Sequence, residues 1–141
     1  MSAENNEAII RRAYEEVWNQ GKIDVADEVV APDMIRHDPG TPDVTGGLEA
    51  HKELVATLRA AFPDLHLSIE DLLSEGNKVA LRFTFRGTHK GEFMGTAATG
   101  KQVTVSGLEI AHFKDGKCVE HWVNWDVMGF LQQIGAIPDN N

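Results

Sequence analysis

Apolar side chains recur every three or four residues in the first half of this chain, which is the spacing of one face of a helix. The pattern predicts helices over three segments: 9–18, 23–30 and 47–61. Gly21 and Pro63 end the first and third of them. A short strand over 34–37 and a turn-rich segment over 38–43 separate the second helix from the third.

From residue 65 onward, apolar and polar residues alternate, which is the period of a strand with one buried face. The pattern predicts strands over four segments: 65–69, 79–85, 103–113 and 118–125. A glycine-rich stretch over 87–100 interrupts the alternation, and 127–137 adds a C-terminal helix. This order predicts one α+β domain over 1–141, in which helices cover one face of a curved antiparallel sheet and enclose a pocket.

The composition narrows the classes of ligand. The net charge is −9 at pH 7, and no cluster of Lys or Arg offsets it. We therefore expect neither nucleic acid nor an anionic membrane as a partner. A single cysteine, Cys118, excludes an internal disulfide, and the first residues do not resemble a secretory signal. We expect a cytoplasmic protein.

The last strand carries two sets of side chains on opposite faces. One set combines an aromatic ring with carboxylates and an amide, as the wall of a polar pocket does: Glu120, Trp122, Asn124 and Asp126. The other set is apolar enough to pack against another surface: Val119, His121, Val123 and Trp125. Left uncovered, the second set would form an exposed apolar patch, so we expect a homodimer that buries it.

The register of the last hairpin decides which face His112 joins. A two-residue loop at 115–116 places His112 on the face opposite to Asp126. A three-residue loop at 114–116, with Gly116 in the left-handed conformation, places His112 on the same face as Asp126. Because a slip of one residue turns every side chain to the other face, the pattern leaves both registers open.

Four segments resemble the SnoaL-like polyketide cyclase and predicted ester cyclase family of the NTF2-like superfamily. They are GTHKGEFMG at 87–95 with TGK at 99–101, DGKCVEHW at 115–122 with WD at 125–126, LQQIG at 131–135, and FPDL at 62–65. Their order and spacing extend over nearly the whole chain. The resemblance implies a cone-shaped NTF2-like domain with one pocket.

The resemblance also implies a chemistry. In the polyketide cyclases of this family, an aspartate near the end of the last strand is the acid/base for an intramolecular aldol closure, and a histidine on the neighbouring strand holds the enolate oxygen. By position these are Asp126 and His112, which favours the three-residue loop. Such a closure requires no metal and no cofactor. The expected contacts to a small, apolar, oxygenated ligand are His37, Tyr14, Trp18, Trp122 and Asn124.

Other interpretations compete with this one. Asp126 could simply cap the C-terminal helix, and His112 could be a half-buried strand residue. The protein could bind a ligand without catalysis. Epoxide hydrolysis, which in this superfamily uses two aspartates and an arginine, could draw on Asp126 and Arg82, but the sequence offers no convincing second aspartate. The spacings of known metal motifs are absent, so we expect no metal site.

Overall fold

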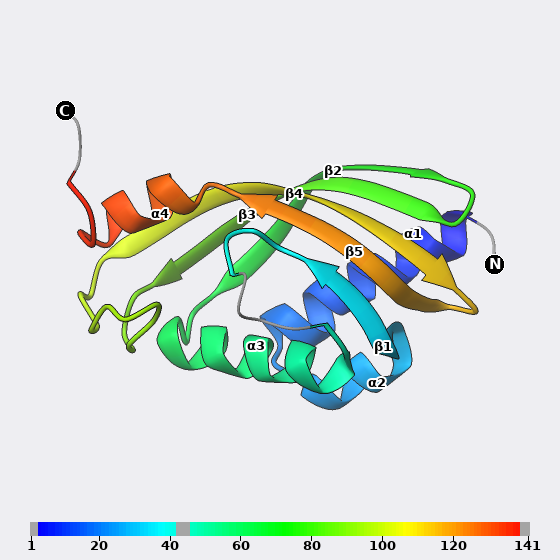
Figure 1. The fold of residues 1–141 in the computed structure, drawn as a ribbon, viewed down its shortest axis with the longest axis horizontal. Coiled ribbons are helices and arrows are strands. Elements are labelled where there is room, and N and C mark those ends of the chain that lie inside the picture. The colour runs from blue at the N-terminus through cyan, green and yellow to red at the C-terminus, as the bar shows by residue number, and fades with distance from the viewer. Residues whose placement is uncertain (1–2, 42–45, 139–141) are drawn as a thin grey trace.

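A five-stranded sheet with helices beneath it forms the part of the chain that the structure describes (Figure 1). The computed structural model describes residues 3–41 and 46–138. The helical segments are α1 (Ala3–Arg12), the π-helix η1 (Ala13–Asn19), the 3₁₀ turn η2 (Ile23–Val25), α2 (Ala26–Val29), α3 (Leu48–Ala61) and α4 (Val127–Gln133). The strands are β1 (Val30–His37), β2 (His66–Glu75), β3 (Lys78–Thr88), β4 (Gln102–Lys114) and β5 (Lys117–Trp125).

The strand order is β1-β5-β4-β3-β2, and the predicted α+β fold is confirmed. Strands β2 to β5 form antiparallel neighbours, but β1 runs parallel to β5, so the sheet is not entirely antiparallel. A long connection through α3 and three other strands separates β1 from β5, and such a crossover permits parallel pairing. Pro32 lies inside the edge strand β1, where a missing N–H is tolerated.

The hairpin between β4 and β5 combines features of both predicted registers. Its turn has two residues, 115–116, both with positive φ, as a type I′ turn requires. The three-residue loop that the resemblance favoured is therefore wrong. The register then shifts between Phe113 and His112, because β5 carries an extra residue, Val119, in a β-bulge. Owing to this bulge, His112 still pairs with Glu120.

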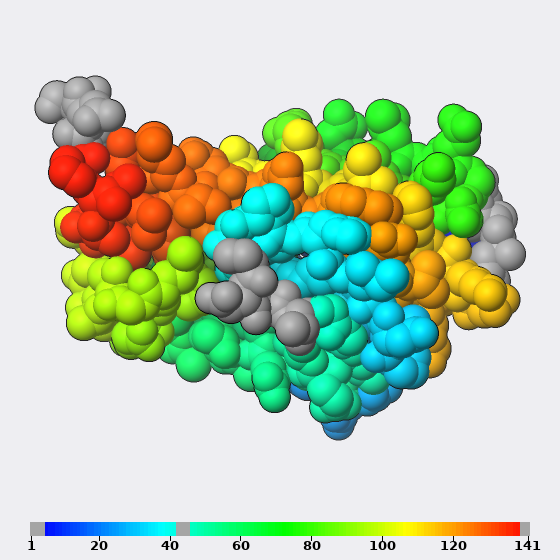
Figure 2. Space-filling view, in the orientation of Figure 1, coloured from blue at the N-terminus to red at the C-terminus, as the bar shows by residue number. Residues whose placement is uncertain are grey.

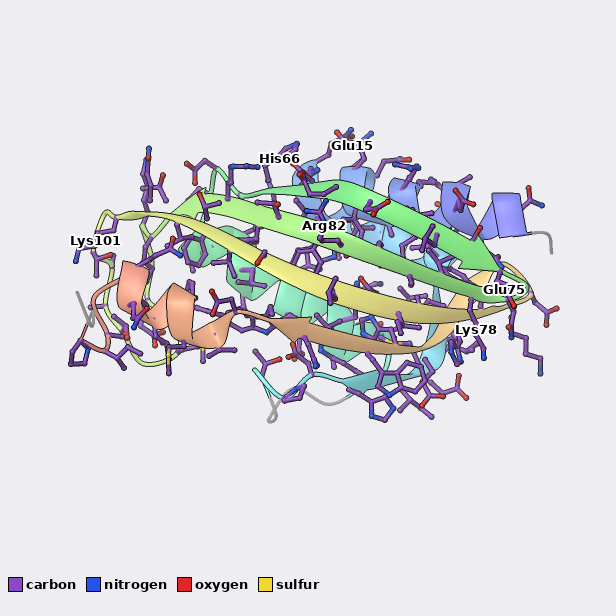
Figure 3. All side chains as sticks on the ribbon, turned by 90° about the horizontal axis from the view of Figure 1, so that it is seen from above. Glu15, His66, Glu75, Lys78, Arg82 and Lys101 are labelled. Carbon is purple, nitrogen blue, oxygen red and sulfur yellow. The ribbon has the colours of Figure 1, made fainter. Side chains whose placement is uncertain are left out.

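The two faces of the sheet differ in what they contact. The inner face packs on the helices and buries a regular series of side chains from β4: Val103, Val105, Ala111 and Phe113. The outer face is open, and Arg82 of β3 projects from it (Figure 3). Leu108, Ile110 and Trp122 are also exposed on this outer face.

This arrangement corrects the expected dimer surface. His121 and Val123 are buried, and Trp125 is half-buried, because their face of β5 is turned toward the helices. They belong to the interior and offer no surface to a second subunit.

In the space-filling view, β1 lies between β5 and α3 on the side of the molecule that faces the reader (Figure 2).

Candidate functional site

A large cavity lies between the inner face of the sheet and the helices. Its walls are mostly apolar and come from both layers, with Ile10, Met34, Leu54, Phe83, Val105 and Phe130 among them. A small group of polar side chains shares this cavity: Tyr14, Arg36, Asp38, His51, Glu109 and His121. A mostly apolar hollow with a few converging polar groups is the usual form of a small-molecule site.

Glu109 lies at the centre of the polar group. Its side chain is buried, and its two carboxylate oxygens have different partners: Oε1 accepts a hydrogen bond from the Tyr14 hydroxyl at 2.6 Å, and Oε2 lies 2.8 Å from Nδ1 of His121. Burial alone would raise the pKa of Glu109. The hydrogen bonds from His121 and Tyr14 and the charge of Arg36 outweigh burial, so the pKa lies below its ordinary value. Glu109 is therefore a buried carboxylate ion.

The contacts of His121 define its tautomer. Its Nε2 lies 3.2 Å from Nη1 of Arg36. A guanidinium only donates hydrogen bonds, so Nε2 must accept one and Nδ1 must carry the proton that points to Glu109. His121 is thus a neutral imidazole, oriented by a carboxylate on one side and by a cation on the other.

Asp38 anchors Arg36 from behind. Nη2 of Arg36 donates to Oδ2 of Asp38 at 2.8 Å, and both side chains are almost entirely buried. The same carboxylate also accepts from the Gly40 amide, the Thr41 hydroxyl and the Trp125 indole. Gly40 packs so closely on this indole that a Cβ would lie 2.4 Å from its nitrogen, which explains a glycine here. Asp38 is therefore held by four donors.

His51 of α3 is a second imidazole of the cavity. Its ring lies edge-on to Trp18 at 5.9 Å and to His121 at 6.3 Å between centroids. Burial, aided by the charge of Arg36, lowers the pKa of His51 to about 3. Its Nδ1 is buried and has no hydrogen-bond partner among the described residues. His51 is consequently neutral over the whole ordinary pH range.

The π-helix η1 positions two aromatic side chains of the wall. Tyr14 and Trp18 are one turn apart in η1, and both line the cavity, where the sequence expected ligand contacts. Burial and the neighbouring Glu109 raise the pKa of Tyr14 well above its ordinary value, so its hydroxyl remains a donor. Short π-helical segments occur frequently at functional sites.

The other predicted site residues do not converge on the cavity. They lie on the outer face of the sheet or at its edge and line no part of the hollow: His37, His112, Trp122, Asn124 and Asp126. The expected convergence is therefore wrong, because the face of β5 that carries Trp122 and Asn124 is turned outward. The alternation of a strand defines two faces but not which of them the helices cover.

Each of these residues has other partners in the structure. The His37 ring stacks on Trp122 at 4.9 Å, and its Nε2 lies 2.7 Å from Glu120. Asp126 is exposed, and its Oδ1 accepts a hydrogen bond from the Gly129 amide, so it caps α4. Arg82, considered for epoxide hydrolysis, is exposed on the outer face (Figure 3).

The sequence did carry a signal for the residues it missed. Glu109 falls in the apolar phase of β4, between positions that are otherwise Val, Gly, Ala and Phe. His121 occupies the same phase in β5, and Arg36 shares the buried phase of Met34 in β1. An ionisable side chain in the buried phase of a strand requires partners inside the fold. No short sequence motif contains all three of these residues, so the sequence does not show that they belong to one site.

Two further observations concern the described ranges 3–41 and 46–138. Within them, no group of three or more His, Cys, Asp or Glu side chains is arranged to hold a metal ion. No helix there has the length and apolar character needed to cross a membrane.

Cys118 lines the cavity, but burial raises the pKa of its thiol, which makes it a poor nucleophile.

This chain is similar in sequence to methyl ester cyclases and similar in fold to a solved structure from Streptomyces galilaeus. The aklanonic acid methyl ester cyclase AcmA of Streptomyces galilaeus is 30% identical over 132 residues, which are 91% of this chain and 89% of that protein. The nogalonic acid methyl ester cyclase of Streptomyces nogalater is 27% identical over 84% of this chain and 89% of its own length. The crystal structure of AclR of S. galilaeus, a proposed hydroxylase, matches with a TM-score of 0.86, 31% identity and coverage of 99% and 87% of the two chains.

The family model for SnoaL-like polyketide cyclases matches residues 8–134, a range that includes the polar group of Tyr14, Arg36, Asp38, His51, Glu109 and His121. Together with the fold, the match confirms the resemblance of the four sequence segments. The chain belongs to the SnoaL-like polyketide cyclase family.

Proposed function

We propose that this protein catalyses an intramolecular aldol closure, or a related isomerisation, of a small, mostly apolar, oxygenated substrate. The observation that carries the proposal is the Glu109–His121 pair, a buried carboxylate and a neutral imidazole joined at 2.8 Å in an apolar cavity. A carboxylate behind an imidazole is an effective acid/base pair, because it orients the ring and stabilises the protonated form. The methyl ester cyclases among the relatives support this reaction class.

The proposed reaction begins at Nε2 of His121, which takes a proton from the carbon next to a substrate carbonyl. The electron pair of that C–H bond moves onto the carbonyl oxygen and forms an enolate. The enolate carbon then attacks a second carbonyl of the same molecule and forms a C–C bond. The resulting alkoxide takes the proton back from His121, so the sequence balances without a co-reactant.

Glu109 and Tyr14 support this cycle without contacting the reacting carbon. Once His121 is protonated, the ionised Glu109 lies against a cation and stabilises it. Tyr14 holds the other carboxylate oxygen at 2.6 Å and keeps the carboxylate plane aligned with the imidazole. The apolar walls keep water away from the enolate, which favours ring closure over reprotonation by solvent.

Turnover of aklanonic acid methyl ester, followed by loss of substrate and formation of a cyclised product of equal mass, tests the proposal. Glu109→Gln and His121→Phe should each lower kcat by roughly 10²–10⁴-fold, as loss of an acid/base group does. The matched control is Glu120→Gln, which removes a carboxylate hydrogen-bonded to a histidine on the outer face. A folded Glu109→Gln protein that retains the wild-type rate would contradict the proposal.

The control Asp126→Asn separates this site from the one that the sequence favoured. Asparagine caps a helix about as well as aspartate, so the fold should persist. Because Asp126 is exposed outside the cavity, we expect unchanged turnover. If no variant and no wild-type sample turns over any cyclase substrate while the cavity still binds it, the protein is a ligand-binding member of the family.

We also infer a homodimer, formed through the outer face of the sheet. Leu108, Ile110 and Trp122 are 60%, 46% and 37% exposed on neighbouring positions of β4 and β5, a cluster that an isolated subunit would leave in water. Light scattering of the wild type should give twice the mass of one chain, and Ile110→Lys should give a folded monomer. A monomeric wild type at micromolar concentration would refute this inference.

The single, buried Cys118 is consistent with a cytoplasmic location.

A further inference from the structure

Arg36 is the one lysine or arginine among the described residues that line the cavity. The guanidinium has five N–H groups. Nη2 donates to Asp38 and Nη1 faces the neutral His121, while the buried Nε has no hydrogen-bond partner in the described part of the chain. A buried donor without a partner costs free energy, and a neutral imidazole is a weak partner for a cation. The side of Arg36 that faces His121 therefore lacks an anionic partner.

We propose that Arg36 is the oxyanion anchor of this pocket, and that its ligands are enolisable 1,3-dicarbonyl compounds or β-keto esters. The proposal deepens the proposed function and rests on it for the direction of proton transfer. The enolate oxygen of the ligand would accept a hydrogen bond from Nη1 of Arg36, in place of the contact between that nitrogen and His121.

The separation of the two nitrogens fits such a ligand. Nη1 of Arg36 and Nε2 of His121 are 3.2 Å apart. In a carbonyl compound, the oxygen and the α carbon are about 2.4 Å apart, as follows from the C=O and C–C bond lengths and the angle between them. One ligand can therefore place its oxygen on Arg36 and its α C–H on His121 at the same time. When the oxygen takes the Nη1 donor, Nε2 of His121 is free to accept the proton.

Asp38 keeps the anchor rigid without neutralising it fully. Four donors share the Asp38 carboxylate, and Arg36 supplies only one of them. A fixed cation next to the developing charge needs no reorganisation when the enolate forms. The anchor also explains a preference for acidic C–H groups, because the second carbonyl of a 1,3-dicarbonyl compound shares the negative charge.

Benzoylacetone, an aromatic 1,3-diketone whose enolate absorbs in the near ultraviolet, is a probe that requires no turnover. A saturating amount of wild-type protein should lower the pH midpoint of enolate formation by about one to two units, the size of a charge-assisted hydrogen bond. Arg36→Met alone would leave Asp38 buried and unpaired, so the informative variant is Arg36→Met combined with Asp38→Asn. This double variant should return the midpoint to that of free benzoylacetone.

Two single variants sharpen the test. Arg36→Lys, which retains the charge but loses the planar fork, should give a smaller shift. Arg82→Met removes the same charge from the outer face (Figure 3) and should behave as the wild type. Near-ultraviolet circular dichroism of each variant verifies the fold. A full midpoint shift in the folded double variant, or no shift in the wild type, overturns the proposal.

The two proposals can fail separately. If Glu109→Gln abolishes turnover of aklanonic acid methyl ester but the benzoylacetone midpoint does not depend on Arg36, the cyclase proposal stands and the anchor is refuted. If the midpoint depends on Arg36 but no turnover occurs, the cavity is an enolate-binding site and the cyclase proposal is refuted.

Discussion

On each face of the sheet, one residue of β5 forms a histidine–glutamate pair with a residue of a neighbouring strand. On the inner side, His121 lies 2.8 Å from Glu109, and their side chains are 7% and 10% exposed. On the outer side, His37 lies 2.7 Å from Glu120, and their side chains are 44% and 30% exposed. The residue types and the distances are nearly the same, so burial is the property that separates the two pairs.

The residue types and the distance within such a pair therefore do not identify an active site. Water screens the outer pair and solvates either partner when the other is removed. Water does not solvate the inner pair in this way, because its remaining hydrogen bonds come from Tyr14 and Arg36 inside the cavity. Only the inner carboxylate is held as an ion in an apolar environment, where it can support proton transfer.

The largest expected difference between the two pairs is in stability. Glu109→Ala leaves the Tyr14 hydroxyl and the His121 imidazole buried without their acceptor, and it should lower the free energy of unfolding by about 3–5 kcal/mol. Glu120→Ala should lower it by less than about 1 kcal/mol. Urea unfolding of both variants measures these values. Equal losses would show that burial does not separate the pairs.

The second-largest expected effect is a loss of stability at acidic pH that comes from the inner side of the sheet. The pKa of His51 is about 3 in the fold and near its ordinary value of 6.5 in the unfolded chain. As the pH falls through this window, the unfolded chain takes up a proton that the fold does not, so stability should fall by up to about 1.4 kcal/mol per pH unit. The pKa of Glu109 is also lowered, so its stabilising contribution is present above its ordinary pKa of 4.5 and is lost as the pH falls from there through the lower pKa of the fold.

His51→Leu isolates this contribution, because it removes the titrating ring and retains an apolar side chain of similar size. The midpoint of urea unfolding, measured between pH 4.5 and 6.5, should decline less steeply for His51→Leu than for the wild type. An identical decline in both proteins would show that His51 is not the group responsible.

The cap at the end of β5 should have a smaller effect. Asp126→Ala removes the acceptor of the Gly129 amide at the start of α4 and should cost about 1 kcal/mol. Asp126→Asn should restore most of this loss. Thermal unfolding of both variants measures it, and a loss in Asp126→Asn as large as in Asp126→Ala would exclude the cap as its cause.

The smallest effect is expected at the outer histidine. His37→Ala removes a partly exposed hydrogen bond to Glu120 and one face of the Trp122 stack, and it should change the free energy of unfolding by less than about 1 kcal/mol. Turnover in the cavity should not change. A large loss of turnover in a folded His37→Ala protein would mean that the outer side takes part in the reaction, and it would break the comparison between the two pairs.

Much of the fold could be predicted from the chain alone. The apolar periods located α3 and the last three strands within three residues, because each element must bury one face. The strand predicted over 65–69 continues to Glu75 in β2, where the alternation of buried and exposed positions is weak. The family segments also correspond to local packing. His89 of the GTHK segment stacks on Phe62 of the FPDL segment at 5.4 Å, and its Nδ1 lies 3.0 Å from Thr99 in the TGK segment.

The candidate site was predicted only in part, and the reason lies in β4 and β5. Tyr14 and Trp18 were expected at the cavity because they share the apolar stripe of a helix, which can face only the core. His112, Trp122 and Asn124 were assigned to the cavity from their shared face, and that grouping is correct. The sequence analysis was wrong about where this face points: it is the more polar face of the hairpin, and it is turned toward solvent.

The chain alone predicted most of the elements, their order, the family and which side chains of one strand share a face, since all of these depend on local periodicity and on short segments. Which face of the sheet became the interior was set by tertiary packing. That choice depends on where β1 and the helices close over the sheet and on the bulge at Val119. Glu109 and His121 lie on the two strands of one hairpin, but Arg36 lies 85 residues from His121 in the chain, so its place beside them in the cavity is a property of the packed fold.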